Sequence, residues 1–470
     1  MGFLRTSNQE LADLDTYVFS LCSRIRTRID SESGVSDDCY DMASKRLLTE
    51  TNPSFLVAAI ILLFVVFSTI SCSSSRRKSA DRSSGTRDTA TAYISSVEYT
   101  PIINVYIENS GSMDGYVKGQ TEFEQIVYNY LVDLKQIRIA KELNLNYINS
   151  EILPQQDDIR DFIEKLEPSS FKAKGGNRGS SDMALMIKDI LAEMNDTIVS
   201  IFISDCIFSP GKGKNAEDYL VNQQIGIKNY LGDYINEHPN LAVVGYRCMS
   251  QFEGLCYDKN DSGKYYKGSR PFYIWLFGGQ GAINRIRIEM QKNNRPLKGV
   301  ENEFTVFAGG AGMPDSCYAI KIKSGNFDLD KTDPKHSILN LKADKGGRIR
   351  FSVEVNYAPL ILNDDYLCNT DLYELSDPKF KLVSVERIKD YKKYSHLLTF
   401  ETDHVHPTTL DVLIKTATPT WPELYNDDEG NEITEDNADK TFGIKYMAEG
   451  IASAIIKKNY YTRMTININK

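Results

Sequence analysis

Between residues 100 and 295 the chain alternates short apolar runs with amphipathic segments. The apolar runs 102–107, 198–203, 241–246 and 272–277 predict buried strands. Apolar residues at helical spacing predict helices at 121–136, 157–166, 182–194, 216–237 and 282–291. Because strands and helices alternate, we expect parallel strands joined by right-handed crossovers. The pattern therefore predicts an α/β domain, residues 98–297, with a doubly wound, mostly parallel sheet.

After about residue 300 the pattern changes to short strand-like segments separated by turn residues. These segments are 304–307, 318–323, 349–355, 381–386, 396–400, 409–414 and 463–469. The helical pattern at 442–457 is an exception. Many short strands in succession are typical of a sandwich. We therefore expect a second, β-rich domain, residues 298–470, folded as a β-sandwich.

The N-terminal part carries a sixteen-residue run without charge, residues 55–70, which is followed closely by Cys72. A helix needs roughly 20 apolar residues to cross a bilayer, so the run suits the core of a signal peptide better than a permanent span. We interpret residues 42–72 as a signal peptide or membrane anchor that ends at Cys72. Residues 1–41 are then an N-terminal extension or a wrongly assigned start. The polar segment 73–97 is expected to be a flexible tether.

The residues before Cys72 resemble, in a relaxed form, the cleavage site of bacterial envelope lipoproteins of the Bacteroidetes type. That resemblance implies acylation of Cys72 and a Gram-negative envelope. Arg76, Arg77 and Lys78 do not look like the acidic export signal of surface-exposed lipoproteins, which favours the periplasmic side of the outer membrane. A type II membrane protein that keeps its N-terminal helix is the competing interpretation.

Composition narrows the function classes only slightly. Apolar residues make up 41% and charged residues 25%, as in an ordinary globular protein. The net charge of −9 argues against a nucleic-acid partner, which normally meets a basic domain. Eight scattered cysteines contain no CxxC pair. Cys248 and Cys256 either bridge a loop or remain buried free thiols.

The first predicted strand runs directly into a loop with candidate metal ligands. Glu108, Ser110 and Ser112 are spaced at every second position, and Gly111 allows a tight turn between the serines. The carboxyl end of a parallel strand is the usual ligand position of an open α/β sheet. Carboxylate and hydroxyl oxygens suit a hard divalent cation such as Mg²⁺. The loop therefore predicts a magnesium site.

Two further loops are expected to reach the same edge of the sheet. The glycine-rich segment 175–182 leads into a helix and presents Ser181, with Ser180 as a possible substitute. Asp205 ends the next strand. Three loops that each deliver an oxygen ligand form a more specific signal than the first loop by itself.

This constellation resembles the metal-ion-dependent adhesion site of von Willebrand factor A domains. The family pattern is Asp-x-Ser-x-Ser on one loop, a threonine on a second and an aspartate on a third. The matching residues are Glu108, Ser110, Ser112, Ser181 and Asp205, and Met113 and Gly115 also fit the family's first loop. Glu108 replaces the aspartate, Ser181 the threonine, and Cys206 a glycine that commonly follows the third-loop aspartate.

The same residues also have plain structural interpretations. Ser110 and Ser112 can cap a helix, and Asp205 can satisfy loop backbone, in a related fold without metal. Other candidates are weaker: His404 and His406, the Lys212–Lys214 loop, and the acidic segment 427–439 as a calcium site. No GxxxxGK[ST] or GxSxG motif occurs.

The resemblance implies a binding module in which the ion keeps an open position for a carboxylate of a protein partner. We therefore expect metal-dependent adhesion or assembly at the envelope, rather than an enzyme. The first alternative is a metal-dependent envelope hydrolase with Glu108 or Asp114 as general base. The second is a metal-free structural scaffold.

Overall fold

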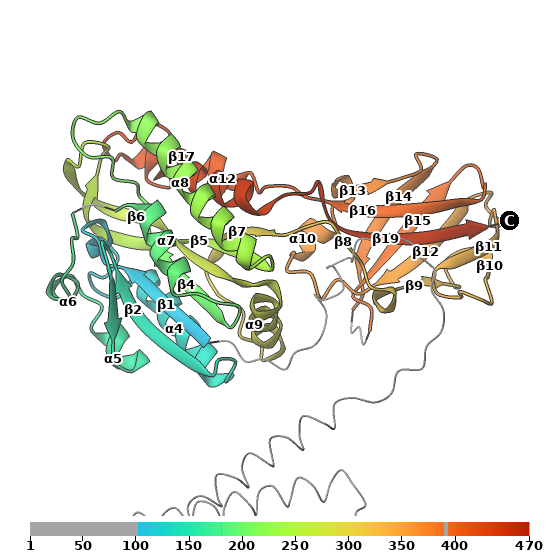
Figure 1. The fold of residues 1–470 in the computed structure, drawn as a ribbon, viewed down its shortest axis with the longest axis horizontal. Coiled ribbons are helices and arrows are strands. Elements are labelled where there is room, and N and C mark those ends of the chain that lie inside the picture. The colour runs from blue at the N-terminus through green and yellow to red at the C-terminus, as the bar shows by residue number, and fades with distance from the viewer. Residues whose placement is uncertain (1–101, 180, 390–392, 470) are drawn as a thin grey trace, which may run out of the picture. The chain divides into compact units, whose positions relative to one another are not determined.

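The computed structural model describes residues 102–179, 181–389 and 393–469 (Figure 1). Cys72, the segments 1–41, 42–72 and 73–97, and Ser180 lie outside the described residues, so the anchor and tether stay predictions. Within the described part, no helix is long and apolar enough to cross a membrane.

A seven-stranded sheet organises the first part of the chain (Figure 1), with the strand order β3-β2-β1-β4-β6-β5-β7. Its strands are β1 (Ile102–Glu108), β2 (Glu142–Ile148), β3 (Ile152–Gln155), β4 (Ile198–Ser204), β5 (Leu241–Tyr257), β6 (Gly263–Gly279) and β7 (Val300–Phe307). The α/β class is confirmed, and four predicted strands lie within β1, β4, β5 and β6. The strands β2 and β3 were not predicted, because polar residues interrupt their apolar pattern.

The expectation of a mostly parallel sheet is wrong. Only β1–β2 and β1–β4 are parallel, whereas β2–β3, β4–β6, β5–β6 and β5–β7 are antiparallel. The reason is the long β5–β6 hairpin, which places β6 between β4 and β5. The polar, tyrosine-rich segment 256–269 is the distal part of this hairpin.

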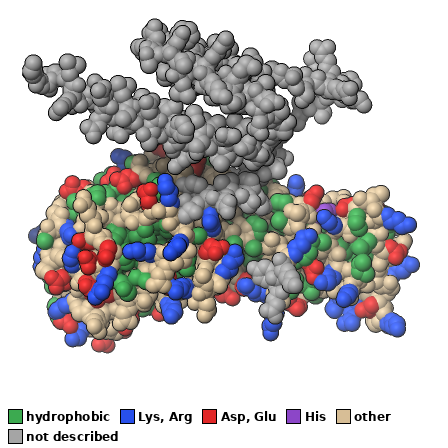
Figure 2. Space-filling view, turned by 90° about the horizontal axis from the view of Figure 1, so that it is seen from below, with side chains coloured by type: hydrophobic (Ala, Val, Ile, Leu, Met, Phe, Trp, Pro, Cys, Tyr) green, Lys and Arg blue, Asp and Glu red, His purple; other side chains and the backbone are tan. Residues whose placement is uncertain are grey.

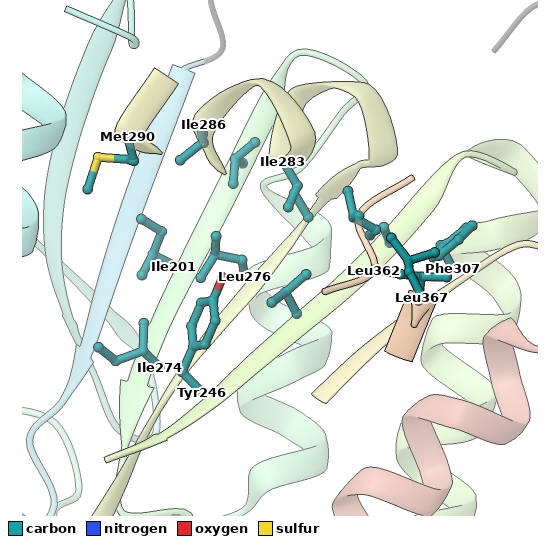
Figure 3. Packing of buried hydrophobic residues seen from close by; sticks show 14 of the residues in the cluster. Ile201, Tyr246, Ile274, Leu276, Ile283, Ile286, Met290, Phe307, Leu362 and Leu367 are labelled. Atoms are coloured by element: carbon teal, nitrogen blue, oxygen red, sulfur yellow. The ribbon is translucent and has the colours of Figure 1, made fainter. Parts of the chain in front are cut away.

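Helices cover both faces of this sheet. Along β1, Ile103, Val105 and Ile107 belong to one buried cluster while Tyr106 belongs to the other, as the alternation of side chains along a strand requires. The first cluster includes residues of α4 (Glu122–Gln136), α5 (Ile159–Glu164), α6 (Pro168–Ala173) and α9 (Gln280–Lys292). The second includes residues of α7 (Met183–Ala192), α8 (Ala216–Glu237), α11 (Trp421–Leu424) and α12 (Ile444–Ile455). Figure 3 shows Ile283, Ile286 and Met290 of α9 beside the sheet residues Ile201 and Leu276.

The later part of the chain is β-rich, as expected, and contains two further sheets. The larger has the order β10-β11-β19-β16-β13, with β8 also paired to β19, and the smaller has the order β14-β15-β12-β9. Phe351 and Leu398 of the smaller sheet and Leu410 and Ile466 of the larger belong to one buried cluster. This cluster also includes Ile103 and Val105 of the first sheet, so the β-rich character is confirmed and the sandwich stays a prediction.

The bounds of these strands are β8 (Ala311–Gly312), β9 (Tyr318–Lys321), β10 (Asn326–Leu329), β11 (Ser337–Lys342), β12 (Ile349–Val355), β13 (Tyr373–Leu375), β14 (Phe380–Arg387), β15 (His396–Thr402), β16 (Thr408–Lys415) and β19 (Tyr460–Asn469). A small ladder joins β17 (Asn426–Asp427) and β18 (Thr441–Phe442). The short helices are η2 (Ser112–Gly115), η3 (Asp315–Cys317), α10 (Asp364–Leu367), η4 (Thr370–Leu372) and η5 (Glu435–Asn437).

The expected division of the chain at residue 297/298 does not match the sheets. Strand β7 continues the first sheet through its pairing with β5. Helix α12 packs along α8, and Gly443, which precedes α12, lies against Phe208 and Leu220. The chain therefore leaves the α/β layer after β7, builds most of the β-rich part, returns to cover α8, and ends in β19.

The possible Cys248–Cys256 disulfide is absent, since both thiols are free and buried. Both residues lie on β5, where each residue advances the strand by about 3.3 Å, so their Cα atoms are too far apart for a bridge. Acidic and basic side chains are interspersed over the described surface seen in Figure 2.

Candidate metal centre

The candidate residues meet at the edge of the sheet where the parallel strands β1 and β4 end. These two strands pair in register through Ile107 and Ile203, so Glu108 and Ser204 lie at the same level. Glu108 is the last residue of β1, and η2 begins four residues later with Ser112. Asp205 directly follows β4, and Ser181 precedes α7. The topology thus brings all five predicted donors to one edge.

Glu108 is the centre of the hydrogen-bond network at this edge. Its carboxyl group is fully buried, and its Oε1 accepts a hydrogen bond from the Ser181 hydroxyl at 2.6 Å. Its Oε2 accepts a hydrogen bond from the Ser204 hydroxyl. Burial, and then the charge of Asp205, raise the pKa of Glu108 to about 7. A carboxyl group in this position is easily protonated in the absence of a cation.

The two serines of the first loop lie side by side. The Oγ atoms of Ser110 and Ser112 are 2.9 Å apart and hydrogen-bonded. The Ser110 hydroxyl interacts with Glu108, and the Ser112 hydroxyl with Asp205. A connected chain of oxygen atoms therefore runs from Ser181 through Glu108 and the two serines to Asp205.

Asp205 contributes an oxygen atom without a hydrogen-bond partner. Its side chain is 1% exposed, and Oδ1 accepts a hydrogen bond from the Ile207 N–H at 3.2 Å. Oδ2 is buried and accepts no hydrogen bond. Burial raises the pKa of Asp205, and the backbone N–H of Ile207 and the Ser112 hydroxyl oppose this rise. A buried acceptor without a partner is costly, and a cation would satisfy it.

These residues fit a hard divalent cation in their chemistry. Two carboxyl groups and three serine hydroxyls are oxygen donors of the kind that Mg²⁺ prefers. The described residues contain no group of three or more His, Cys, Asp or Glu side chains that could hold a metal. The candidate centre does not form such a group, because only two of its five proposed metal ligands are acidic and the other three are serines.

Ser204 belongs to the centre, although the sequence reasoning did not select it. Its hydroxyl donates to Glu108 and accepts a hydrogen bond from the Cys206 N–H at 2.7 Å. Cys206 adopts a left-handed backbone with φ of 54°, a conformation that favours glycine. The sequence signal that could have identified Ser204 is its position directly before Asp205.

The second loop is held against the ends of β1 and β2 by asparagines. Asn149 Nδ2 donates to Asn109 Oδ1 at 2.9 Å and to the Gly175 carbonyl at 3.0 Å. Gly176 has φ of 71°, and a Cβ there would lie 2.0 Å from Asn149 Oδ1. Gly176 is therefore required by its close approach to Asn149 and by its positive φ, and Gly175 by its positive φ of 93°.

The β5–β6 hairpin extends beyond the end of β4 and packs against the first loop. Strand β6 pairs with β4 only up to Tyr273, and its earlier residues continue past that edge with β5. A Cβ on Gly115 would lie 2.3 Å from the Phe252 ring, and one on Gly111 would lie 3.4 Å from the Tyr257 hydroxyl. The hairpin helps to bury the donors, of which Ser112 is the most exposed at 9%.

The weaker candidates are held by other partners. His406 pairs with Asp377 at 2.8 Å, and Glu401, near the histidine pair, pairs with Arg350 at 2.6 Å. In the acidic segment, Asp427 accepts hydrogen bonds from the Glu429 and Gly430 N–H groups. Salt bridges join its Asp428 to Lys445 and its Glu432 to Lys264. The Lys212–Lys214 segment is an exposed turn. These features have structural explanations.

A scan against protein-family models, a search of curated proteins and a search of solved structures each found no match. The functional argument therefore depends on the residues of the centre.

Proposed function

We propose that this protein is a metal-dependent binding module whose α/β part holds Mg²⁺ or another divalent cation in a site similar to that of von Willebrand factor A domains. The observation that carries the proposal is the convergence of three loops, two of them at strand ends and one before helix α7, on one set of neighbouring oxygens. This set includes the buried Asp205 Oδ2, which has no hydrogen-bond partner. Glu108, Ser110, Ser112, Ser181 and Asp205 would hold the ion.

The ion would add positive charge beside two buried carboxyl groups, of which Asp205 already interacts with the charge of the buried Arg270. Hydroxyl donors are neutral, so a bound divalent cation keeps enough positive charge to attract a carboxylate from a protein partner. The residues of this chain hold the donors in place: Ser204 supports Glu108, and the Ile207 N–H supports Asp205.

The interactions of Glu108 and Asp114, the two candidate general bases, favour a binding function over hydrolysis. Glu108 accepts hydrogen bonds from two hydroxyls. Asp114 forms an ion pair with Arg178. In the proposed site Glu108 would hold the ion and Asp114 is held by Arg178, so neither carboxylate is left to take a proton from a substrate or water.

The cellular setting is part of the proposal. Residues 42–72, with Cys72 as the lipid attachment point, would anchor the protein to the periplasmic side of the outer membrane, and residues 73–97 would hold the module away from the lipid surface. The partner is then an envelope protein that offers an Asp or Glu side chain.

The first test measures Mg²⁺ binding to the full-length chain in detergent by calorimetry. We expect one ion per chain in the wild type, and an affinity at least about tenfold weaker in Asp205→Asn and in the double variant Ser110→Ala with Ser112→Ala. His404→Ala is the matched control outside the centre. Equal affinity in all variants, or no binding to the wild type, would refute the proposal.

The second stage uses immobilised peptides with an exposed Glu or the corresponding Gln. Capture of the Glu peptide should require Mg²⁺, stop in EDTA and disappear in Asp205→Asn. Capture that continues in EDTA would contradict metal-bridged binding. Mg²⁺ binding without Glu-dependent capture would indicate an ion with a purely structural role.

A further inference from the structure

Arg178 lies in the glycine-rich second loop and contacts the first loop at four points. Its carbonyl accepts a hydrogen bond from the Gly111 N–H at 3.0 Å. Its guanidinium donates to the Asn109 carbonyl at 2.5 Å, to the Ser110 carbonyl at 3.0 Å and to the Asp114 carboxylate. The side chain is 15% exposed. One residue therefore joins the two loops that carry four of the five donors.

We propose that Arg178 is a positioning residue for the metal centre, which sets the affinity for the ion by holding Ser181 against Glu108 and the two serines of the first loop. The inference rests on the proposed function. Arg178 would not itself contact the ion, because its guanidinium binds backbone carbonyls and Asp114. The proposed metal ligands are nearby residues of the two loops that Arg178 joins.

The physical reason is preorganisation. The second loop contains Gly175, Gly176 and Gly179, and glycine-rich backbone loses much conformational freedom when it is ordered. Without the Arg178 contacts, part of the free energy of ion binding would be used to order this loop. The affinity for the ion would therefore fall.

A second effect of Arg178 acts in the opposite direction, because a guanidinium near the site repels a cation. The ion pair with Asp114 reduces this effect, since the pair carries no net charge. We therefore expect the loss of positioning to exceed the gain from removing the charge in Arg178→Gln.

Arginine is required at this position by its geometry. The planar guanidinium reaches two carbonyls and one carboxylate at once, whereas a lysine ammonium is a compact point charge on a flexible stem. Arg178→Lys keeps the charge and should restore only part of the affinity lost in Arg178→Gln.

The test measures Mg²⁺ affinity by calorimetry, and thermal unfolding in EDTA, for the full-length chain. We expect Arg178→Gln to weaken Mg²⁺ binding by about tenfold or more and Arg178→Lys to give an intermediate value. In the Asp114→Asn background, Arg178→Gln should have a smaller effect, because the two side chains act together. Arg160→Gln is the matched control, since Arg160 forms an exposed ion pair with Glu164 on α5.

A purely structural role would lower the unfolding temperature in EDTA while leaving the Mg²⁺ affinity of the folded protein unchanged, and that result would overturn the inference. Tighter binding in Arg178→Gln would also overturn it, because charge repulsion would then dominate. If Arg178→Gln does not fold, the Arg178→Lys affinity decides. Absence of Mg²⁺ binding in the wild type would instead refute the proposed function, so the two failures are distinguishable.

Discussion

At the scale of single residues, Glu108 shows how position changes the chemistry of a side chain. It stands where the family resemblance expects aspartate, and it is fully buried at the end of β1. Its carboxyl group accepts hydrogen bonds from two serine hydroxyls. Burial and the neighbouring Asp205 raise its pKa, so the metal-free centre favours a proton on this carboxyl.

This pKa predicts a pH dependence of stability in the metal-free protein. Burial raises the pKa of Glu108 in the folded state to about 7, whereas the ordinary pKa of a glutamate side chain is 4.5. Between these values the folded state holds more protons than the unfolded state, so stability falls as pH rises and the loss is complete above about pH 7. In EDTA, we expect the unfolding temperature of the wild type to fall relative to that of Glu108→Gln by roughly 3 °C or more between pH 5 and pH 8. Parallel pH profiles of the two proteins would contradict this expectation.

At the scale of elements, the junction before α12 depends on one glycine. Gly443 has φ of 90°, and a Cβ there would lie 2.5 Å from Phe208 Cδ2 and 2.6 Å from Leu220 Cδ2. Alanine would strain the backbone and push α12 away from α8. The glycine lets the returning chain approach the α/β layer closely enough to bury the apolar face of α12.

We expect Gly443→Ala to lower the free energy of unfolding by about 2 kcal/mol or more, as measured by urea denaturation. The matched control is Gly232→Ala inside α8, where a Cβ meets no atom within 4 Å. That change should stabilise the protein by roughly 0.5–1 kcal/mol, because alanine is the better helix former. Similar effects of the two substitutions would show that the approach of Gly443 to Phe208 has little energetic weight.

At the scale of the whole molecule, the chain crosses three times between the α/β layer and the β-rich part: after β7, before α11 and before β19. The segment that contains α11 and α12 covers the second face of the first sheet, and the last strand β19 lies between β11 and β16. Neither part is complete within one continuous stretch of sequence. Each therefore depends on residues near the C-terminus.

A chain that ends at residue 416 should consequently lose both supports. It would lack α12, which covers Ile227 and Leu231 of α8, and it would lack β19. We expect strong binding of an apolar dye and loss of cooperative thermal unfolding, compared with the full-length chain. Cooperative unfolding at an unchanged temperature would indicate that the α/β layer folds without the returning segment.

The sequence predicted much of the local structure and the composition of the candidate site. Helix α8 was predicted with the bounds that it has. Four of the five proposed metal ligands were selected at the ends of predicted strands, and Ser181 was selected in the glycine-rich loop that leads into a helix. Ser204 and Arg178 were missed, since their roles depend on contacts with Glu108 and the first loop across long stretches of sequence. Strand β2 was missed because polar residues interrupt its apolar pattern.

The sequence by itself determined where apolar runs form strands, where amphipathic segments form helices, and which oxygen donors follow the strands. These features depend on local periodicity and on residue chemistry. Only the tertiary structure decided that β6 lies between β4 and β5, that β7 belongs to the first sheet, and that α12 returns to α8. These arrangements arise from pairing and packing between segments far apart in the chain, where many orders satisfy the same local pattern and the burial of the whole core selects one of them.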